Sequence, residues 1–180
     1  MRRLSFNRPK EKLRGIKRRL KSIDSWANSF EGYFPSEYSQ DKYWNCKIPI
    51  LDRMVNQPTT TKELQAHCAK AMLRAAYLIN KAKPSSHNQS IVTVLLTSPD
   101  MFSSEICVFF DTDHFKSFYT RDSKHEKLIP ISNKSLLNEL NIEVNNGFNE
   151  SGFKYLSREE WDGEIISFEQ EWWSYRAIHG

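Results

Sequence analysis

The stretch IVTVLL at residues 91–96 decides the fold class of this chain. It is short, continuous and rich in β-branched residues, which is typical of a strand buried on both faces. The run EICVFF at residues 105–110 has the same character, and the turn-rich residues TSPDMFS lie between the two. We therefore predict that the two runs pair as a β-hairpin.

Two helices are predicted on the N-terminal side of this hairpin. Apolar side chains recur at steps of three and four over residues 13–30, which predicts an amphipathic helix over about 10–30. A second helix is predicted from the capping box at residues 60–63, with Thr60 as the N-cap, and it ends at Pro84. The predicted fold class is therefore α+β, with a small antiparallel sheet packed against two long helices.

The other segments give weaker patterns. Two stretches look irregular, residues 31–58 and residues 141–163, and Ser151-Gly152 in the second resembles a turn. Three further elements are predicted: an edge strand at 128–131, a short helix at 133–140 and a strand at 164–178, although the last pattern also fits a helix.

Composition excludes several classes of protein. The chain has 180 residues, of which 39% are hydrophobic and 27% charged, so it is neither wholly disordered nor collagen-like. It has no apolar stretch of about 18 residues that would span a membrane, and no apolar core of a secretory signal. Three cysteines without a close pair indicate a reducing compartment, so a cytoplasmic protein is expected.

Charge is distributed unevenly along the chain. Residues 1–21 hold ten Lys or Arg and one acid, a net charge of +9, whereas the remainder holds 16 basic and 21 acidic residues, a net charge of −5. We predict a basic arm at residues 1–9 and one α+β domain at 10–180. Such a basic end is typical of a segment that binds a polyanion, although it could equally fold onto the chain's own acidic body.

The expected function is a non-enzymatic binding protein whose basic N-terminal helix engages RNA, DNA or an acidic protein surface. Arginine makes bidentate contacts with phosphate and carboxylate groups, and lysine adds point charges. The predicted polyanion-binding residues are Arg2, Arg3, Arg8, Lys12, Arg14, Lys17, Arg18, Arg19 and Lys21. No membrane partner is expected, and the oligomeric state stays open.

Three stretches of the chain also resemble a family of small uncharacterised proteins from Gram-positive bacteria. They are RGIKRR at residues 14–19, WNCKIPILD at 44–52 and SEICVFFD at 104–111. The resemblance covers about residues 2–155. It implies no activity and no catalytic residue, because the family has no established function.

Two alternative functions are also compatible with the sequence. A protein-binding inhibitor or immunity-type factor would use Trp172 and Trp173 as anchors, because Trp is enriched in binding hot spots. A metal-dependent hydrolase would use Asp111, Asp113 and His114, a weak metal-site candidate whose simpler interpretation is a helix cap. No zinc-ligand spacing, nucleophile elbow or phosphate-binding loop occurs, so no cofactor is expected.

Overall fold

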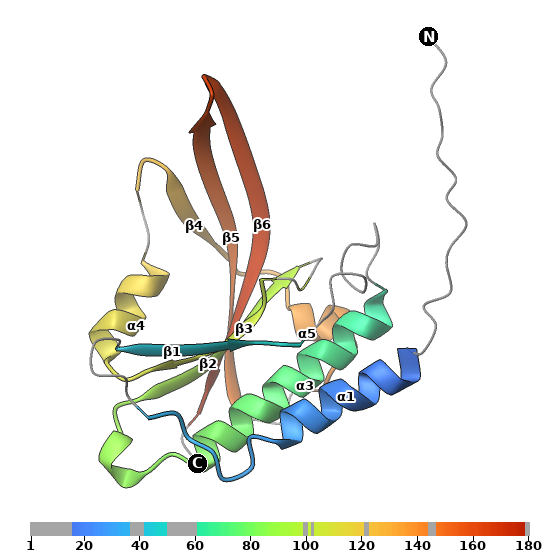
Figure 1. The fold of residues 1–180 in the computed structure, drawn as a ribbon. Helices are drawn as coiled ribbons and strands as arrows, with labels where there is room; N and C mark the ends of the chain where they lie inside the picture. The colour runs from blue at the N-terminus through green and yellow to red at the C-terminus, as the bar shows by residue number, and fades with distance from the viewer. Residues whose placement is uncertain are drawn as a thin grey trace.

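The computed structural model describes residues 16–36, 42–49, 61–98, 101, 103–120, 123–143 and 147–178. These residues build one antiparallel sheet of six strands in the order β1-β3-β2-β6-β5-β4, with helices packed on it (Figure 1). The predicted α+β class is confirmed. The prediction of a small sheet is wrong, because strands from both ends of the chain add to the central hairpin.

The predicted central hairpin is confirmed. Its strands are β2, Ile91–Ser98, and β3, Glu105–Phe109. In their register, Val92 lies opposite Val108 and Val94 opposite Ile106. Six of the eight residues of β2 are buried, because β2 has a neighbouring strand on each side and helices on the sheet faces.

Strand β1, Tyr43–Lys47, lies in a segment predicted to be irregular, so that prediction is wrong for these residues. β1 pairs antiparallel with β3, and Trp44 lies opposite Val108. Tyr43 and Trp44 favour extended structure but Asn45 and Lys47 do not, so the local preference of this short segment is modest. Its pairing partner β3, about sixty residues farther along the chain, stabilises it.

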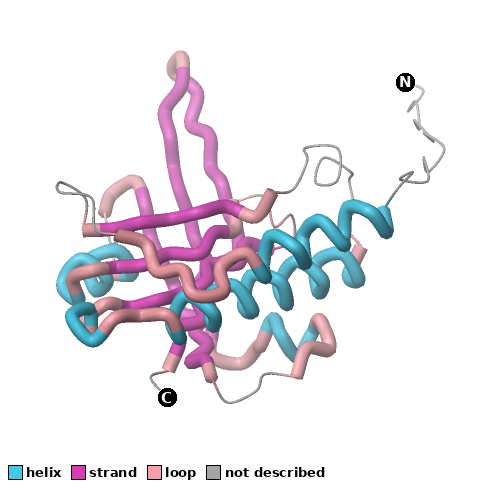
Figure 2. The backbone as a smooth tube through the Cα atoms, turned by 60° about the horizontal axis from the view of Figure 1, so that its bottom comes forward, coloured by secondary structure: helices cyan, strands magenta, loops and turns pink. Residues whose placement is uncertain are grey.

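The last two strands form a long hairpin: β5, Phe148–Trp161, and β6, Glu164–Ala177. Strand β6 confirms the strand predicted for residues 164–178, whereas the irregular segment predicted at 141–163 is wrong over β5. Asp162 and Gly163 both have positive φ, 52° and 81°, as the two central residues of a type I′ hairpin turn require. The distal half of the hairpin projects beyond the body (Figures 1 and 2).

The predicted turn at Ser151-Gly152 is also wrong, because both residues lie inside β5. Gly152 faces the ring of Trp173 on β6, and an added Cβ would come within 2.5 Å of that ring. The glycine therefore permits a close approach of strand and indole and does not mark a turn.

Two short elements accompany this hairpin. Strand β4, Glu126–Ile131, pairs with β5 at the edge of the sheet, which confirms the predicted edge strand containing Pro130. Helix α5, Leu136–Glu139, is a single turn and is shorter than predicted. Its N-cap is Ser135, whose hydroxyl accepts a hydrogen bond from the backbone N–H of Asn138 at 3.3 Å.

Helices α1, Ile16–Asn28, and α3, Lys62–Lys81, lie side by side against one face of the sheet (Figures 1 and 2). They span 13 and 20 residues, so "two long helices" overstates the described helical layer, and the predicted start of the first helix lies outside the described residues. The N-cap of α3 is Thr61 and not Thr60, because the Thr61 hydroxyl accepts from the Leu64 N–H at 3.3 Å.

A one-turn 3-10 helix, η1, Ser85–His87, connects α3 to β2. Helix α4, Thr112–Tyr119, lies on the opposite side of the sheet from α1 and α3, because it packs on Phe109, which alternates with the core-facing Val108. There, the ring centroid of Phe115 lies 5.3 Å from that of Phe109. No helix in the described ranges combines the length and apolar character needed to cross a bilayer.

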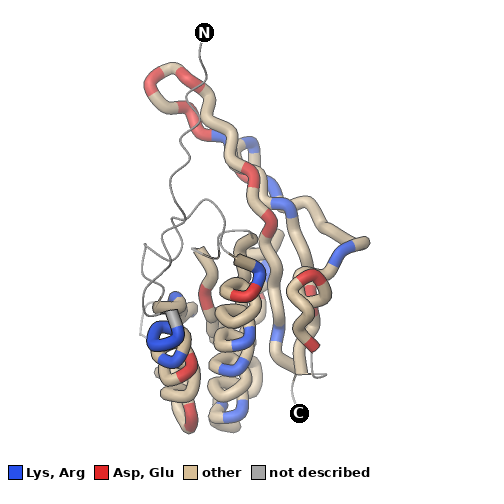
Figure 3. The backbone as a smooth tube through the Cα atoms, turned by 90° about the vertical axis from the view of Figure 1, so that its right-hand side faces the viewer, with Lys and Arg blue, Asp and Glu red and all other residues tan. Residues whose placement is uncertain are grey.

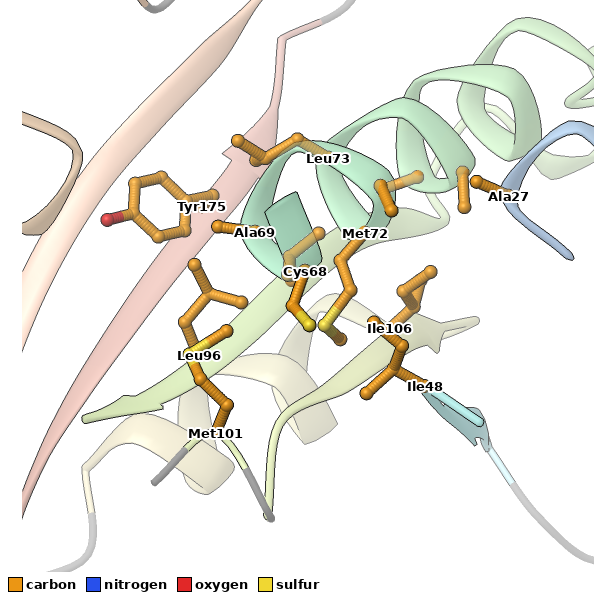
Figure 4. Close-up of a cluster of buried hydrophobic side chains, with 14 of the residues drawn as sticks. Ala27, Ile48, Cys68, Ala69, Met72, Leu73, Leu96, Met101, Ile106 and Tyr175 are labelled. Carbon is orange, nitrogen blue, oxygen red and sulfur yellow. The ribbon is translucent and has the colours of Figure 1, made fainter. Parts of the chain in front are cut away.

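The core lies between α3 and the sheet. Cys68 and Met72 of α3 face Leu96 of β2 and Ile106 of β3, and Ala27 of α1 approaches from the side (Figure 4). Because the apolar stripe of each helix is used in this contact, the polar faces of both helices are left to solvent.

Candidate functional site

The described part of the predicted basic helix carries three of its four cations on the outside of the molecule. Lys17, Arg18 and Lys21 are exposed, whereas Arg19 is half-buried and its Nη1 atom has no hydrogen-bond partner among the described residues. The other predicted polyanion-binding residues lie outside the described residues. They are Arg2, Arg3, Arg8, Lys12 and Arg14.

Helix α3 adds a second set of cations that the sequence analysis missed. Lys70, Arg74, Tyr77 and Lys81 are exposed and follow one another at steps of four, three and four, so they form one stripe along the outer face of α3. The Tyr77 ring is 54% exposed within this stripe. The spacing of this stripe can be seen in the sequence, but the helix that lies beside it in space cannot.

That neighbour is α1, which runs parallel to α3. His67 of α3 lies 3.3 Å from the carbonyl oxygen of Leu20 and 3.0 Å from the carboxylate of Asp24. Farther along both helices, the Arg74 guanidinium donates a hydrogen bond to the side-chain carbonyl of Asn28. These contacts join the outer sides of α1 and α3 into one surface, which we call the basic helical face.

The basic helical face has a marked excess of positive charge. Each of the two helices carries four Lys or Arg and one acid, so together they have a net charge of +6. Figure 3 shows Lys and Arg along both helices, whereas Asp and Glu gather on the projecting hairpin. One of the two acids, Asp24, is already paired with His67.

This arrangement has a definite chemistry. Several cations on one face can neutralise consecutive phosphates and release their counterions, which gives binding that weakens as salt rises. An exposed aromatic ring beside such cations offers a surface on which an unpaired base can stack. Phosphate contacts alone do not read a base sequence.

The predicted protein-binding pair is split by the alternation of side chains along β6. Trp173 is 1% exposed and lies in the core, where a partner cannot reach it. Trp172 points to the other face of the sheet and is half-buried, with its ring stacked on Tyr155 at 4.1 Å and 13°. Of the two predicted anchors, only Trp172 is accessible to a partner. The inhibitor hypothesis stays a prediction.

The predicted metal candidates are placed at the start of α4, where two of them have other partners. Asp111 is the N-cap, accepting from the Asp113 N–H at 2.7 Å and from the Lys42 ammonium at 2.8 Å. The hydrogen bond from Lys42 lowers the pKa of the Asp111 carboxyl, and the Asp113 N–H adds to this effect. Asp113 is exposed and lies 3.7 Å from Lys116.

The third candidate, His114, packs its ring against Phe109 and Tyr43, at centroid distances of 5.8 and 6.2 Å. Within the part of the chain that the structure describes, no group of three or more His, Cys, Asp or Glu is arranged to hold a metal ion. The helix-cap interpretation of Asp111 is confirmed, and a hydrolase activity stays a prediction.

Comparison with known families places most of the chain in one of them. A family model described as "Protein of unknown function (DUF3916)" matches residues 24–177. Neither a curated protein nor a solved structure matches the chain. The matched region includes all of α3 but only residues 24–28 of α1, so the α3 stripe lies inside it and the α1 cations lie outside it.

Proposed function

The chain belongs to the DUF3916 family of proteins of unknown function, and we propose that it is a binding protein whose basic helical face engages a polyanion, namely RNA or DNA. The observation that carries the proposal is the net charge of +6 on two adjoining helices. The cations of residues 1–15, including Arg2, Arg3 and Arg8, would supply further contacts to the polyanion. The resemblance noted above supports a Gram-positive bacterial source.

Cytoplasmic action is part of the proposal. The three cysteines, Cys46, Cys68 and Cys107, are all free thiols. Free thiols persist in the reducing cytosol, where nucleic acids are also abundant. The expected binding tolerates many sequences, because lysine and arginine on a helix surface contact the phosphate backbone first.

The test is the salt dependence of binding by the full chain. Fluorescence anisotropy with a labelled single-stranded oligonucleotide should show the logarithm of affinity falling linearly with the logarithm of salt concentration. The triple variant Lys70→Gln/Arg74→Gln/Lys81→Gln should reduce the steepness of that slope by about 2, since each lost phosphate contact removes roughly 0.7 for a single strand.

A matched control neutralises three exposed lysines outside both helices, Lys47→Gln/Lys124→Gln/Lys127→Gln, and should leave the slope unchanged. Equal slopes for the two triple variants would overturn the basic helical face as the binding site. Absence of binding to RNA and DNA at low salt, together with binding to poly-glutamate, would replace the nucleic acid with an acidic protein surface.

A further inference from the structure

The end of the β5–β6 hairpin presents an unusual apolar surface to solvent. We call residues 157–169 the acidic hairpin arm. Trp161, Ile166 and Phe168 in this arm are 72%, 54% and 49% exposed. The strand register places Trp161 opposite Glu164 and Ile166 opposite Glu159, so these five side chains lie on one face of the arm.

The arm is also strongly acidic. It contains one basic residue, Arg158, and five acids, so its net charge is −4. The acids are Glu159, Glu160, Asp162, Glu164 and Glu169. This charge repels a polyanion and the identical arm of a second copy, whereas it attracts a basic segment that carries apolar side chains.

The arm leaves strand edges open. Among the described residues, β2 pairs with β6 only from Glu171 to Arg176, so within the arm residues 164–169 of β6 pair with β5 alone. The backbone groups along such an edge can accept an additional strand, and the side chains on the adjoining face then select its sequence.

We propose that the acidic hairpin arm is the docking surface for this chain's own basic segment, residues 1–15. This segment carries six Lys or Arg and one acid, a net charge of +5 against the −4 of the arm. Leu4 and Phe6 lie between Arg3 and Arg8, so the segment carries apolar side chains among its cations. Arginine can pair with the arm's carboxylates and stack on exposed rings such as Trp161.

The direction of the helices supports docking within one molecule. The Asn80 side chain, near the end of α3, donates to the carbonyl of Ile178, just beyond β6, at 3.4 Å. Because β6 runs away from the arm, its C-terminal end and the adjacent end of α3 lie far from the arm. Helix α3 and the parallel α1 therefore both begin on the side of the molecule nearer to the arm (Figure 1).

Residues 1–15 directly precede α1 in the chain, so the segment is tethered to the start of that helix. Fifteen residues can extend up to about 50 Å, and a tether raises the local concentration of the segment at the arm. This inference does not depend on the proposed polyanion, which would compete for the same cations.

The experiment is a cross-linking measurement on the full chain. The variant Ser5→Cys/Ser167→Cys places one thiol in the segment and one on the arm, and a bismaleimide joins them where they approach. We expect a 5–167 link in the monomer band, mapped by peptide mass, at several-fold higher yield than the 5–132 link in the control Ser5→Cys/Ser132→Cys. The yield should fall as salt rises, because exposed charges are screened.

Charge reversal on the arm identifies the docking surface. In the Ser5→Cys/Ser167→Cys background, Glu159→Lys/Glu160→Lys/Glu164→Lys should lower the yield about fivefold, through loss of several surface ion pairs. The matched reversal Glu31→Lys/Asp113→Lys/Glu143→Lys changes net charge equally at exposed sites off the arm and should leave the yield unchanged.

Three outcomes would overturn the proposal. The first is a 5–167 yield no greater than the 5–132 yield. The second is an equal response to the two triple reversals. The third is a link found only in the dimer band, which would assign the arm to the segment of a second copy. None of these outcomes bears on oligonucleotide binding, so the proposed function is tested separately.

Discussion

The absence of a side chain at Gly152 is required by the indole ring that covers it. An alanine Cβ would meet the Trp173 ring at 2.5 Å, and that ring is held in the core at 1% exposure. We expect Gly152→Ala to lower the free energy of unfolding by about 1–3 kcal/mol, the usual effect of overpacking. Urea denaturation measures it.

The neighbouring substitution Ser151→Ala is the control, because Ser151 is exposed on the same strand. Its effect should stay within about 0.5 kcal/mol of the unsubstituted protein. Equal stabilities for Gly152→Ala and the unsubstituted protein would contradict the close packing of Gly152 against Trp173.

At the scale of the element, the first turn of α3 depends on one hydroxyl. Thr61 accepts a hydrogen bond from the Leu64 N–H, which would otherwise lack a partner in the helix. Thr61→Ala should therefore destabilise the protein by about 1 kcal/mol, whereas Thr61→Ser should retain most of the stability. Thermal unfolding compares the two. A larger loss in Thr60→Ala than in Thr61→Ala would instead support the cap predicted from the sequence.

Elements that carry their own pattern could be predicted from the sequence, and elements stabilised by distant partners could not. Helix α3 and the β2–β3 hairpin are contiguous patterns of apolar residues, so local reasoning finds them. Strand β1 needs β3 to pair with, and the distal part of β5 is exposed and shows no alternating burial. Local sequence patterns predict a loop for a segment of this kind, because its partner strand is not known.

The candidate site shows the same division. The cations of α1 are concentrated in the sequence, so a basic helix could be predicted directly. The stripe of Lys70, Arg74 and Lys81 is spread over three turns of α3, and it joins the α1 cations only because the two helices pack side by side. The separation of Trp172 from Trp173 likewise required the position of β6 inside the sheet.

At the scale of the whole molecule, buried thiol and phenol groups make the stability of the fold depend on pH in the alkaline range. Burial raises the pKa of the Cys68 thiol from 9.0 to about 12. The pKa of Cys46 is also raised to about 12, by burial and then by Glu105. The phenol of Tyr175 has a raised pKa as well, because of burial and then Glu150. In the unfolded chain, where these pKa values are not raised, the groups lose their protons at a lower pH. Rising pH therefore stabilises the unfolded state before it affects the folded state.

The contribution of these buried groups to the free energy of unfolding is therefore fully present below about pH 9. It is lost as pH rises toward their folded-state pKa values. Above about pH 9, we expect the free energy of unfolding to fall by at least about 1.4 kcal/mol per pH unit, the contribution of one shifted group. Urea denaturation at a series of pH values measures the slope. Cys68→Ala should show a shallower decline, and a free energy that stays constant to about pH 10.5 would contradict the linkage.

The sequence by itself determined the α+β class, the positions of α3 and the β2–β3 hairpin, and the basic N-terminal end. Each of these depends on neighbouring residues, whose periodicity and charge are local properties. Only the tertiary structure decided the six-strand order, the burial of Trp173, the union of α1 and α3 into one basic helical face, and the exposure of the acidic hairpin arm. These features depend on contacts between residues far apart in the chain, and burial is a property of the surroundings that a residue acquires only when those contacts form.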